Sequence, residues 1–280
     1  MRFSLIFFIF IAPIFFFGCG DSKKTIDQLK VDAENGDVEA QINLGLMYWK
    51  GQGVPHDDNE AVKWYKLAAK QGNANAQYSL GEIMRGDGLP LSLKAAIEWY
   101  KQAAEQGHAA AQNRVGEMYE HGIGVPKDSY EAMKWYNSAA MQGDAVAQFN
   151  LGNIYEHGPS VYRDVNKALK LYKLAAEQGN VNAQHCLGVN YRSGQGVPKD
   201  YNEAIKWYKL AAQQGNANAR FGLALIYEEE GVHQDFVEAY AWFSVTEHKS
   251  ALNMLMKKMT PTQIEQGQVR AKEINSKFNP

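Results

Sequence analysis

Apolar and small residues in this chain follow a helical spacing, and the whole pattern returns about every 36 residues. The phrase LAAKQGNANAQYSLG at 67–81 comes back in related forms, and its leading glycine stands at Gly36, Gly72, Gly107, Gly143, Gly179 and Gly215. A fixed period of this length indicates stacked repeats, because each unit must bury its apolar face against the next. We therefore expect an all-α fold, an α-solenoid of about six antiparallel helix-pair repeats with capping helices.

Each repeat predicts two helices, and the fifth repeat shows the pattern clearly. In its first helix, residues 180–194, Ala183, Leu187 and Tyr191 stand four apart and form one apolar face. Gly188 lies in the middle of this helix, and its counterparts are Gly45, Gly81, Gly116, Gly152 and, in the last repeat, Ala224. A mid-helix glycine costs about 1 kcal/mol relative to alanine, so we expect the second helix to pack too closely for a side chain.

A G-x-G-V-P-K loop, residues 194–199, leads to the second helix at 201–215. We expect Gly194 to end the first helix in a left-handed cap and Pro198 to prevent its continuation. Asp200 is expected to cap the second helix, with Glu203 completing a capping box. The same pair returns as Asp57/Glu60, Asp128/Glu131 and Asp235/Glu238. These carboxylate pairs could suggest catalysis, but their recurrence at helix starts favours capping.

One large aromatic residue stands among the alanines of each second helix. Trp207 has counterparts at Trp64, Trp99, Trp135 and Trp242, with Leu171 in the fourth repeat. We expect these side chains to fill the space between stacked repeats, in preference to a ligand-facing aromatic cage. The fourth loop, HGPSVYRD at 157–164, departs from the pattern because it lacks the second glycine and its proline is displaced.

The phrases A-x-x-x-L-G-x-x-Y and W-Y-x-x-A-A-x-x-G resemble the Sel1-like repeat family, relatives of tetratricopeptide repeats, over about residues 27–249. That resemblance implies adaptor, scaffold or regulatory work through protein binding. Residues 259–264 resemble a segment that often follows such arrays, with Thr260 as cap and Pro261 as first residue of a final helix. We expect a repeat domain at 25–250, whose first helix spans 25–35, and a C-terminal capping region at 251–280.

The first residues differ from the repeats. Residues 3–17 form an apolar run that fits a secretory signal peptide at 1–18, and Gly18-Cys19 resembles a bacterial lipoprotein signal. That resemblance implies a lipid on Cys19 followed by a tether at 19–24, although Phe16 and Phe17 replace the usual leucine and small residue. The alternative is an ordinary signal peptide with a passenger cysteine.

Membrane contact would then be through the N-terminal lipid only. Gly20 after the cysteine implies, by the same analogy, an outer-membrane lipoprotein facing the periplasm. The alternative location is a soluble periplasmic or secreted protein. With Cys19 lipidated, Cys186 is the one thiol left, and we expect it to be buried and inert.

Charge and motif content argue against several function classes. Lys plus Arg total 29 against 31 for Asp plus Glu, a net charge of −2, so no basic excess favours nucleic acid. His121 and His157 share one repeat position beside Glu120 and Glu156, but without metal-ligand spacing they are expected to be surface residues. No G-x-S-x-G elbow, P-loop or dinucleotide fingerprint occurs, so we expect a noncatalytic protein with neither metal nor cofactor.

The candidate site follows if the first helices line the concave side of the array, as in tetratricopeptide arrays. Positions −3, +1 and +4 relative to the repeated glycine then form an exposed stripe. The predicted partner-binding residues are Trp49, Tyr78, Glu82, Asn113, Glu117, Glu120, Phe149, Asn153, Glu156, His185, Arg192 and Phe221. Aromatic anchors around acidic residues suit a peptide groove, unless these rings pack between adjacent first helices.

The sequence therefore predicts a noncatalytic interaction scaffold or adaptor of the bacterial cell envelope that binds a partner protein or peptide in this groove. One alternative is a peptidoglycan- or glycan-binding envelope protein that uses the groove aromatics. Another is a cell-wall hydrolase, which would need a polar catalytic cluster that interrupts the repeats, and the sequence contains none.

Overall fold

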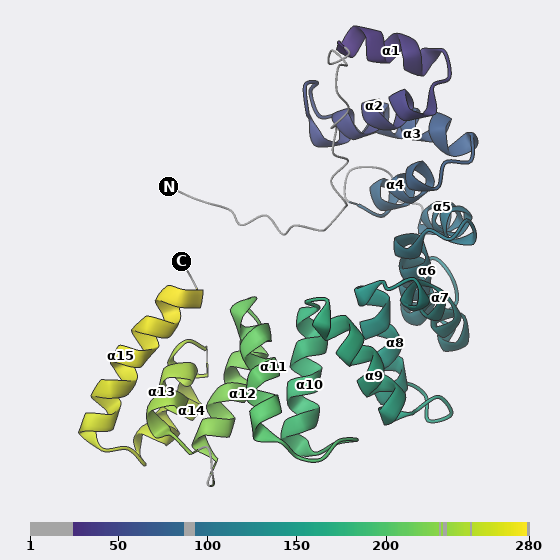
Figure 1. Cartoon of the computed structure of the whole chain (residues 1–280). Coiled ribbons are helices and arrows are strands. Elements are labelled where there is room, and N and C mark those ends of the chain that lie inside the picture. The colour runs from purple at the N-terminus through teal and green to yellow at the C-terminus, as the bar shows by residue number, and fades with distance from the viewer. Residues whose placement is uncertain (1–24, 87–92, 230, 232–233, 247, 279–280) are drawn as a thin grey trace. The chain divides into compact units, whose positions relative to one another are not determined.

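The computed structural model describes residues 25–86, 93–229, 231, 234–246 and 248–278, and within these ranges it contains fifteen α-helices and no strands. Figure 1 shows their order. The helices are α1 (Ile26–Glu34), α2 (Val38–Lys50), α3 (Asp58–Lys70), α4 (Ala74–Arg85), α5 (Leu93–Glu105), α6 (Ala109–His121), α7 (Ser129–Met141), α8 (Ala145–His157), α9 (Val165–Glu177), α10 (Val181–Ser193), α11 (Tyr201–Gln213), α12 (Ala217–Glu228), α13 (Phe236–Ser244), α14 (Lys249–Met256) and α15 (Pro261–Phe278). The predicted signal peptide, Cys19 and the tether lie outside the described residues.

Six helix pairs, from α2/α3 to α12/α13, match the six predicted repeats. We call the even-numbered member of each pair helix A and the odd-numbered member helix B. The chain divides into two compact units at residues 1–72 and 73–280, so the boundary falls between two repeats. In the first unit α1 has Thr25 as its N-cap, and Ala33 packs in one cluster with Leu44 and Trp64. The predicted first helix at 25–35 is confirmed.

The mid-helix glycines lie against tyrosine rings, which confirms the predicted close approach of helix B. A Cβ built on Gly116 would lie 2.6 Å from Cδ1 of Tyr136, and one on Gly188 would lie 2.5 Å from the same atom of Tyr208. The same contact joins Gly45 to Tyr65, Gly81 to Tyr100 and Gly152 to Tyr172. Real Cβ atoms essentially never approach that closely, so each tyrosine requires glycine opposite it.

The caps of helix B follow the prediction in part. The side chain of Asp128 accepts hydrogen bonds from the backbone N–H groups of Tyr130 and Glu131, at 2.9 and 3.1 Å, as an N-cap should. The reciprocal bond of a capping box is absent, because the Asp128 N–H donates to the carbonyl of Tyr119 on helix A at 2.9 Å. Glu131 pairs with Lys134 instead. The capping-box prediction is therefore wrong, and the same backbone bond to helix A is made by Asp57, Asp164, Asp200 and Asp235.

Three of the five repeat tryptophans belong to the core, as predicted, while Trp99 and Trp135 are half-buried. Trp64, Trp207 and Trp242 are buried. Trp207 on α11 packs in one cluster with Ala168 of α9, in the preceding repeat, and with Leu187 of α10, in its own repeat. Leu171, which replaces tryptophan in the fourth repeat, packs likewise on the preceding cluster around Tyr136. These side chains fill the space between successive helix pairs.

The C-terminal cap is confirmed, with one helix more than expected. Thr260 caps α15. Its side-chain oxygen accepts the backbone N–H of Gln263, and its own backbone N–H donates to the side-chain oxygen of Gln263. Gly267 on α15 packs on the ring of Tyr240 in α13. The short helix α14 was not predicted, and its Leu255 is fully buried in the core beneath α15. The last repeat thus packs on the capping helix α15 through a glycine–tyrosine contact, at a different repeat position from the earlier ones.

The fourth loop takes a different path from its relatives. Gly122 and Gly194 end their helices at φ 70° and 77°, whereas Gly158 is extended at φ −68° and ψ −170°. The reason is Pro159, since a residue before proline is restricted to extended conformations. Asp164 still caps α9 and still donates its N–H to the carbonyl of Tyr155 at 2.8 Å. The loop therefore leaves and rejoins the repeat at the usual places while its middle is displaced.

Gly116→Ala is expected to destabilise the protein by about 1–3 kcal/mol, because the new methyl group would overpack against Tyr136. Helix propensity alone predicts the opposite, a gain of about 1 kcal/mol. Equilibrium urea denaturation followed by circular dichroism gives the sign. A stabilised variant would contradict the tyrosine contact.

Asp128→Ala and Glu131→Ala should separate an N-cap from a capping box. Loss of the Asp128 cap is expected to cost about 1 kcal/mol. Loss of Glu131 should cost less than about 0.5 kcal/mol, because its partner Lys134 is exposed. Equal losses in denaturant titrations would show that both residues act in capping.

Candidate functional site

The predicted stripe consists of helix A side chains, and four of its rings contact helix B of their own repeat. Tyr78 lies 5.8 Å from Tyr100 between ring centroids, and Phe149 lies 5.9 Å from Tyr172. The ring of His185 approaches Tyr208 and that of Phe221 approaches Phe243 in the same way, at 5.9 and 5.6 Å. All four stripe rings are half-buried. They are thus held against the core and still show part of their surface.

Carboxylates at position +4 accept hydrogen bonds from the tyrosines of helix B. Tyr136 donates its hydroxyl to Glu120 at 2.7 Å, and Tyr172 donates to Glu156 at 2.8 Å. Burial and these carboxylates raise the pKa of both tyrosines. Arg192 takes the +4 position in the fifth repeat, where burial raises the pKa of Tyr208 and the guanidinium partly offsets that rise. At Tyr136 and Tyr172, the acidic stripe residue therefore accepts the hydroxyl hydrogen of the tyrosine.

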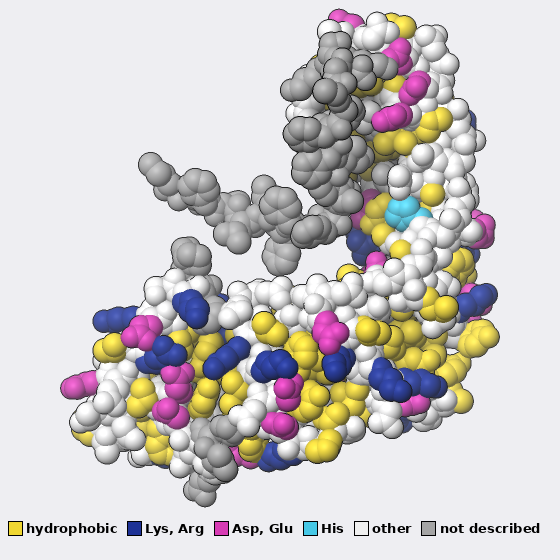
Figure 2. All heavy atoms as spheres, in the orientation of Figure 1, with side chains coloured by type: hydrophobic (Ala, Val, Ile, Leu, Met, Phe, Trp, Pro, Cys, Tyr) yellow, Lys and Arg dark blue, Asp and Glu magenta, His cyan; other side chains and the backbone are white. Residues whose placement is uncertain are grey.

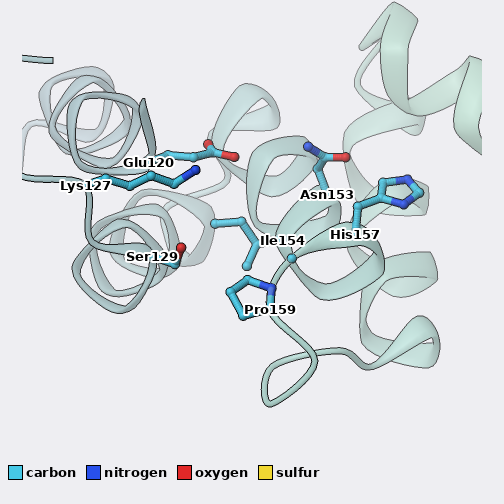
Figure 3. Close-up of a pocket in the computed structure, with 8 residues that line it drawn as sticks. Glu120, Lys127, Ser129, Asn153, Ile154, His157 and Pro159 are labelled. Atoms are coloured by element: carbon cyan, nitrogen blue, oxygen red, sulfur yellow. The ribbon is translucent and has the colours of Figure 1, made fainter. Parts of the chain in front are cut away.

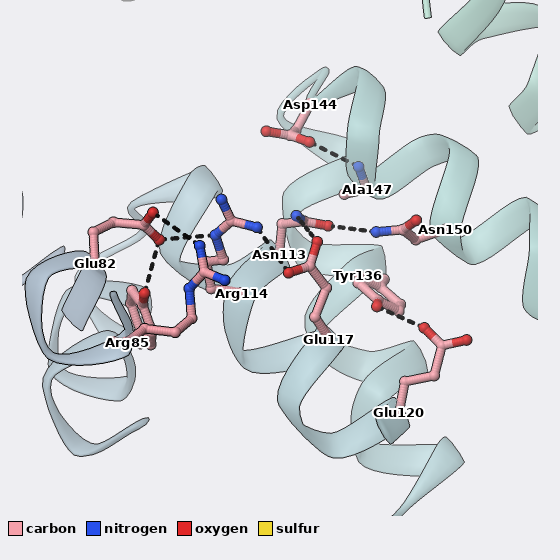
Figure 4. Close-up of polar contacts among 11 residues, drawn as sticks. Glu82, Arg85, Asn113, Arg114, Glu117, Glu120, Tyr136, Asp144, Ala147 and Asn150 are labelled. Carbon is pink, nitrogen blue, oxygen red and sulfur yellow. Dashed lines mark hydrogen bonds and ion pairs between the residues drawn. The ribbon is translucent and has the colours of Figure 1, made fainter. Parts of the chain in front are cut away.

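A polar network joins three successive A helices, α4, α6 and α8 (Figure 4). Arg114 on α6 donates to Glu82 on α4 at 2.9 Å and to Glu117 at 2.8 Å. Asn113 donates to Glu117 at 3.1 Å and accepts from Asn150 on α8 at 3.0 Å. The network holds the helix A side chains of the second, third and fourth repeats in one arrangement.

Glu82 is the most heavily bonded carboxylate of this network. It also accepts from the Tyr100 hydroxyl at 2.7 Å and pairs with Arg85 at 3.3 Å. Burial alone would raise the pKa of the Glu82 carboxyl, but the hydrogen bond from Tyr100 and the charge of Arg114 outweigh it and lower that pKa. Glu82 therefore stays ionised and fully paired.

Burial divides the predicted partner-binding residues. Asn113 is 5% exposed and Glu156 9%, so both support their neighbours and neither offers a side chain to a partner. Trp49, in the first unit, is 39% exposed. The other members of the set are half-buried, and these are Tyr78, Glu82, Glu117, Glu120, Phe149, Asn153, His185, Arg192 and Phe221.

A hollow of about 410 Å³ opens beside the irregular fourth loop (Figure 3). Glu120, Lys127 and Ser129 lie on one side of it, and Asn153 and Ile154 lie across from them. Its remaining lining residues are His157, Gly158 and Pro159. Two members of the predicted stripe, Glu120 and Asn153, thus meet at one pocket.

Lysines of the B helices lie over aromatic rings. Lys206 Nζ stands 5.2 Å from the ring centroid of Trp207, and Lys167 stands 5.3 Å from that of Tyr155. Figure 2 shows Lys and Arg side chains spread over α9 to α13 among hydrophobic ones. These cations cover aromatic surface with their stems and charges, which is a structural role.

Other candidate chemistry is limited. Cys186 was predicted to be buried, but it is half-buried. Burial first and the nearby Glu156 second raise the pKa of its thiol to about 12, which favours the protonated, unreactive form. Within the described residues no group of three His, Cys, Asp or Glu side chains could hold a metal ion. His157 contacts Glu156 at 3.1 Å. Among the described helices, none has the length and apolarity needed to cross a bilayer.

His108 is an unusual N-cap. Its Nδ1 accepts the backbone N–H of Ala111 at 3.1 Å, where the other A helices of the second unit use Asn73, Asp144, Asn180 and Asn216. The imidazole also stacks on the stripe residue Tyr78 at 4.8 Å. Burial lowers the pKa of His108 from its usual 6.5, which keeps Nδ1 available as an acceptor.

Several contributing residues were missed by the sequence analysis. Arg114 and Asn150 stand at position −2, which was not assigned to the stripe, and Lys127 and Ser129 belong to a loop and to the start of a helix B. Arg114 had a readable signal, because it lies three residues before Glu117 on one helix. The pocket depends on the path of the fourth loop. The sequence showed that this loop departs from the repeat pattern, but it did not show the path that the loop takes.

A family model for the Sel1 repeat matches this chain at residues 38–73, 74–108, 109–144, 145–180, 181–216 and 217–244. Each match coincides with one of the six helix pairs. The crystal structure of a protective antigen present in uropathogenic Escherichia coli strains, displaying an SLR fold, is 34% identical with a TM-score of 0.82 over 91% of this chain and 56% of that chain. A Sel1 repeat protein from Oxalobacter formigenes is 35% identical with a TM-score of 0.72, over 80% of this chain and 93% of that one.

Curated relatives match over short segments. A putative Sel1-like repeat-containing protein of Acanthamoeba polyphaga mimivirus is 49% identical over 53 residues, 19% of this chain and 10% of its own. The DAP3-binding cell death enhancer 1 of Rattus norvegicus is 40% identical over 60 residues, 21% of this chain and 12% of its own. The chain therefore spans only about a tenth of the length of these relatives.

His108→Asn should remove one source of acid sensitivity while keeping the cap. Because burial depresses the folded-state pKa of His108, its contribution to stability is present above pH 6.5 and is lost as pH falls through the folded pKa. Chemical denaturation at several pH values below 6.5 is expected to show a weaker loss of stability for the variant than for the parent. Identical slopes would show that His108 does not titrate on unfolding.

Proposed function

The chain belongs to the Sel1 repeat family, and we propose that it is a noncatalytic scaffold of the bacterial cell envelope that binds a partner protein or peptide along its helix A side chains. Sel1 repeat proteins are generally protein-interaction scaffolds. The partner, the envelope location and the contact residues are the parts that this proposal adds.

One observation carries the proposal: the rings of the stripe are fixed by helix B and still half-exposed. Tyr78, Phe149 and Phe221 each lie within 6 Å of a helix B ring, and the Arg114 network fixes the polar residues between the first two. A surface whose side chains are already ordered loses little entropy when a partner binds. Half-exposed aromatic rings are also the residues that dominate binding energy at interfaces.

The burial data refine the proposed contacts. Asn113 and Glu156 are too deep to touch a partner, so we assign them to positioning. Val189 takes their place as a contact residue, because it occupies position +1 on α10 and is 39% exposed. The half-buried members of the predicted stripe remain in the set.

Support for an envelope location comes from the first residues and from one similar structure. The apolar run at 3–17 followed by Cys19 fits a lipoprotein signal. The Escherichia coli protein of 34% identity is described as a protective antigen. We propose attachment through a lipid on Cys19, with the repeats facing the periplasm. A lipid anchor contributes about 0.8 kcal/mol per buried CH₂ group, so a multiply acylated cysteine would hold firmly.

Photocrosslinking in intact cells tests the contact surface. A photoreactive residue at position 189 on helix A is expected to give protein adducts, and one at position 210 on helix B should not. Val189 and Leu210 are similarly exposed, at 39% and 36%, so the pair differs in the face and hardly in accessibility.

Two charged variants complete this experiment. Val189→Arg should reduce the yield of adducts formed from a neighbouring helix A position, and Leu210→Arg should leave it unchanged. Protein adducts from position 210 alone would move the site to helix B. Capture of cell-wall glycan at position 189, with no protein adduct, would replace the scaffold by the glycan-binding alternative.

Cys19→Ser should release the protein from the membrane fraction and abolish labelling by a fatty-acid analogue. Cys186→Ser is the matched control, because that thiol is held protonated in the fold, and this variant should stay membrane-bound and labelled. A membrane-bound, unlabelled Cys19→Ser protein would contradict the lipid anchor.

A further inference from the structure

The pocket beside the fourth loop lies where this loop lacks a close contact with helix B of the preceding repeat. The third and fifth loops make that contact. In the third and fifth loops the second glycine packs on the helix B of the preceding repeat. A Cβ on Gly124 would lie 2.8 Å from the carbonyl oxygen of Leu93, and one on Gly196 would lie 2.4 Å from Val165. Leu93 and Val165 are the first residues of their helices, and Ser129 is the corresponding residue of α7. The fourth loop has Ser160 in place of that glycine, and Ser129 lines the open pocket.

The equivalent place between the fifth and sixth repeats is filled by a carboxylate of the chain itself. Glu229 pairs there with Lys199 at 3.3 Å and accepts the hydroxyl of Tyr201. Lys199 stands eleven residues after the repeated Gly188, as Lys127 does after Gly116. Tyr201 and Ser129 likewise share one repeat position, so the pocket repeats the donors that hold Glu229.

The pocket lacks the carboxylate that these donors would hold. The residue at the repeat position of Glu229 is His157, which contacts Glu156 and points away from Lys127 in Figure 3. Within the described residues, Lys127 forms no ion pair within 4 Å, and neither Ser129 nor Asn153 has a side-chain hydrogen bond. A carboxylate from outside the chain would supply the missing partner.

A second charge completes the chemistry of the pocket. Glu120 accepts from Tyr136 but has no cation within 4 Å among the described residues. Three other stripe carboxylates do, since Glu82 and Glu117 share Arg114 and Glu228 has Lys258. Glu156 contacts the ring of His157. At the filled place, the residue corresponding to Glu120 is Arg192. The hydrogen bond from Tyr201, followed by Lys199 and then the charge of Arg192, lowers the pKa of Glu229. A ligand of this pocket therefore needs a cation for Glu120 as well as an anion for Lys127.

We propose that this pocket binds an α-amino acid as its zwitterion. The carboxylate of the ligand takes the place of Glu229 against Lys127 and Ser129. Its ammonium group pairs with Glu120, which stands at the repeat position that Arg192 occupies at the filled place. Its side chain lies on Ile154 and Pro159, and Asn153 offers a further hydrogen bond across the hollow. The volume of about 410 Å³ lies within the range of small-molecule sites. The pocket shares Glu120 and Asn153 with the partner-binding surface proposed above, but this inference rests on the pocket's own charges and does not require that surface.

The test uses three probes that differ by one charge each, with the methyl resonance of Ile154 as the reporter. L-Leucine carries both charges, N-acetyl-leucine lacks the ammonium group and leucinamide lacks the carboxylate. Leucine is expected to shift the Ile154 signal saturably, and each of the other two should bind at least about tenfold weaker, because each loses one charge-assisted pair. Equal affinity for all three probes, or no saturable shift with leucine, would overturn the proposal.

Variants of the same protein show whether the shift comes from this pocket. Lys127→Met and Glu120→Gln should each weaken leucine at least about tenfold. Lys199→Met, the same repeat position outside the pocket, and Tyr136→Phe, which removes the bond to Glu120 but keeps its charge, should bind as the parent does. His157→Glu should block the site, because it installs the carboxylate that Glu229 supplies elsewhere. A parent-like affinity in Lys127→Met, or in His157→Glu, would exclude this mode of binding.

One further probe distinguishes the source of the zwitterion. Glycyl-leucine holds its charges farther apart than leucine does. Tighter binding of leucine supports a free amino acid as the ligand, and tighter binding of the dipeptide supports the ends of a short peptide at the same two charges. If neither binds more tightly than N-acetyl-leucine, the zwitterion proposal fails.

Discussion

The contact between a tyrosine ring of helix B and a glycine of helix A is the constraint on which the rest of the structure depends. In the first five repeats it brings the two helices of a pair closer than any side chain at that glycine would allow. The glycine lowers the helix propensity of helix A, whereas the contact buries the large tyrosine ring of helix B. The free energy gained from burying the ring is larger than the free energy lost in helix propensity. The separation of helix A from helix B, and so the placement of the stripe, follows from this contact.

The same tyrosine also determines what stands at the edge of helix A. Its hydroxyl emerges at position +4, where Glu120 and Glu156 accept it. Phe243 replaces the tyrosine in the last repeat, and there Glu228 pairs with Lys258 instead. The acidic residues that first suggest a charged groove are thus partly accounted for by the core beneath them. Among these acidic residues, Glu120 forms no ion pair with a described residue.

The sequence was sufficient to predict the helix pairs because the same residue pattern occurs six times. Helix bounds, left-handed caps at Gly122 and Gly194, and the buried tryptophans all follow from local rules applied in register. The capping box failed because the N–H of Asp128 was already bonded to a carbonyl of helix A, a tertiary contact that the D-x-x-E motif does not contain. The pocket escaped prediction for a similar reason, since it arises from the absence of a contact between two repeats.

The bond from each helix B aspartate to the carbonyl of a helix A tyrosine closes the intervening loop at its base. The chain inside that closure can therefore change without moving either helix, as the fourth loop does while Asp164 and Tyr155 keep the bond. Substitutions within the loop therefore change only the segment between the helix A tyrosine and the helix B aspartate. An ancestral array of identical units could in this way acquire a distinct recognition feature at one joint and leave its other joints unaltered.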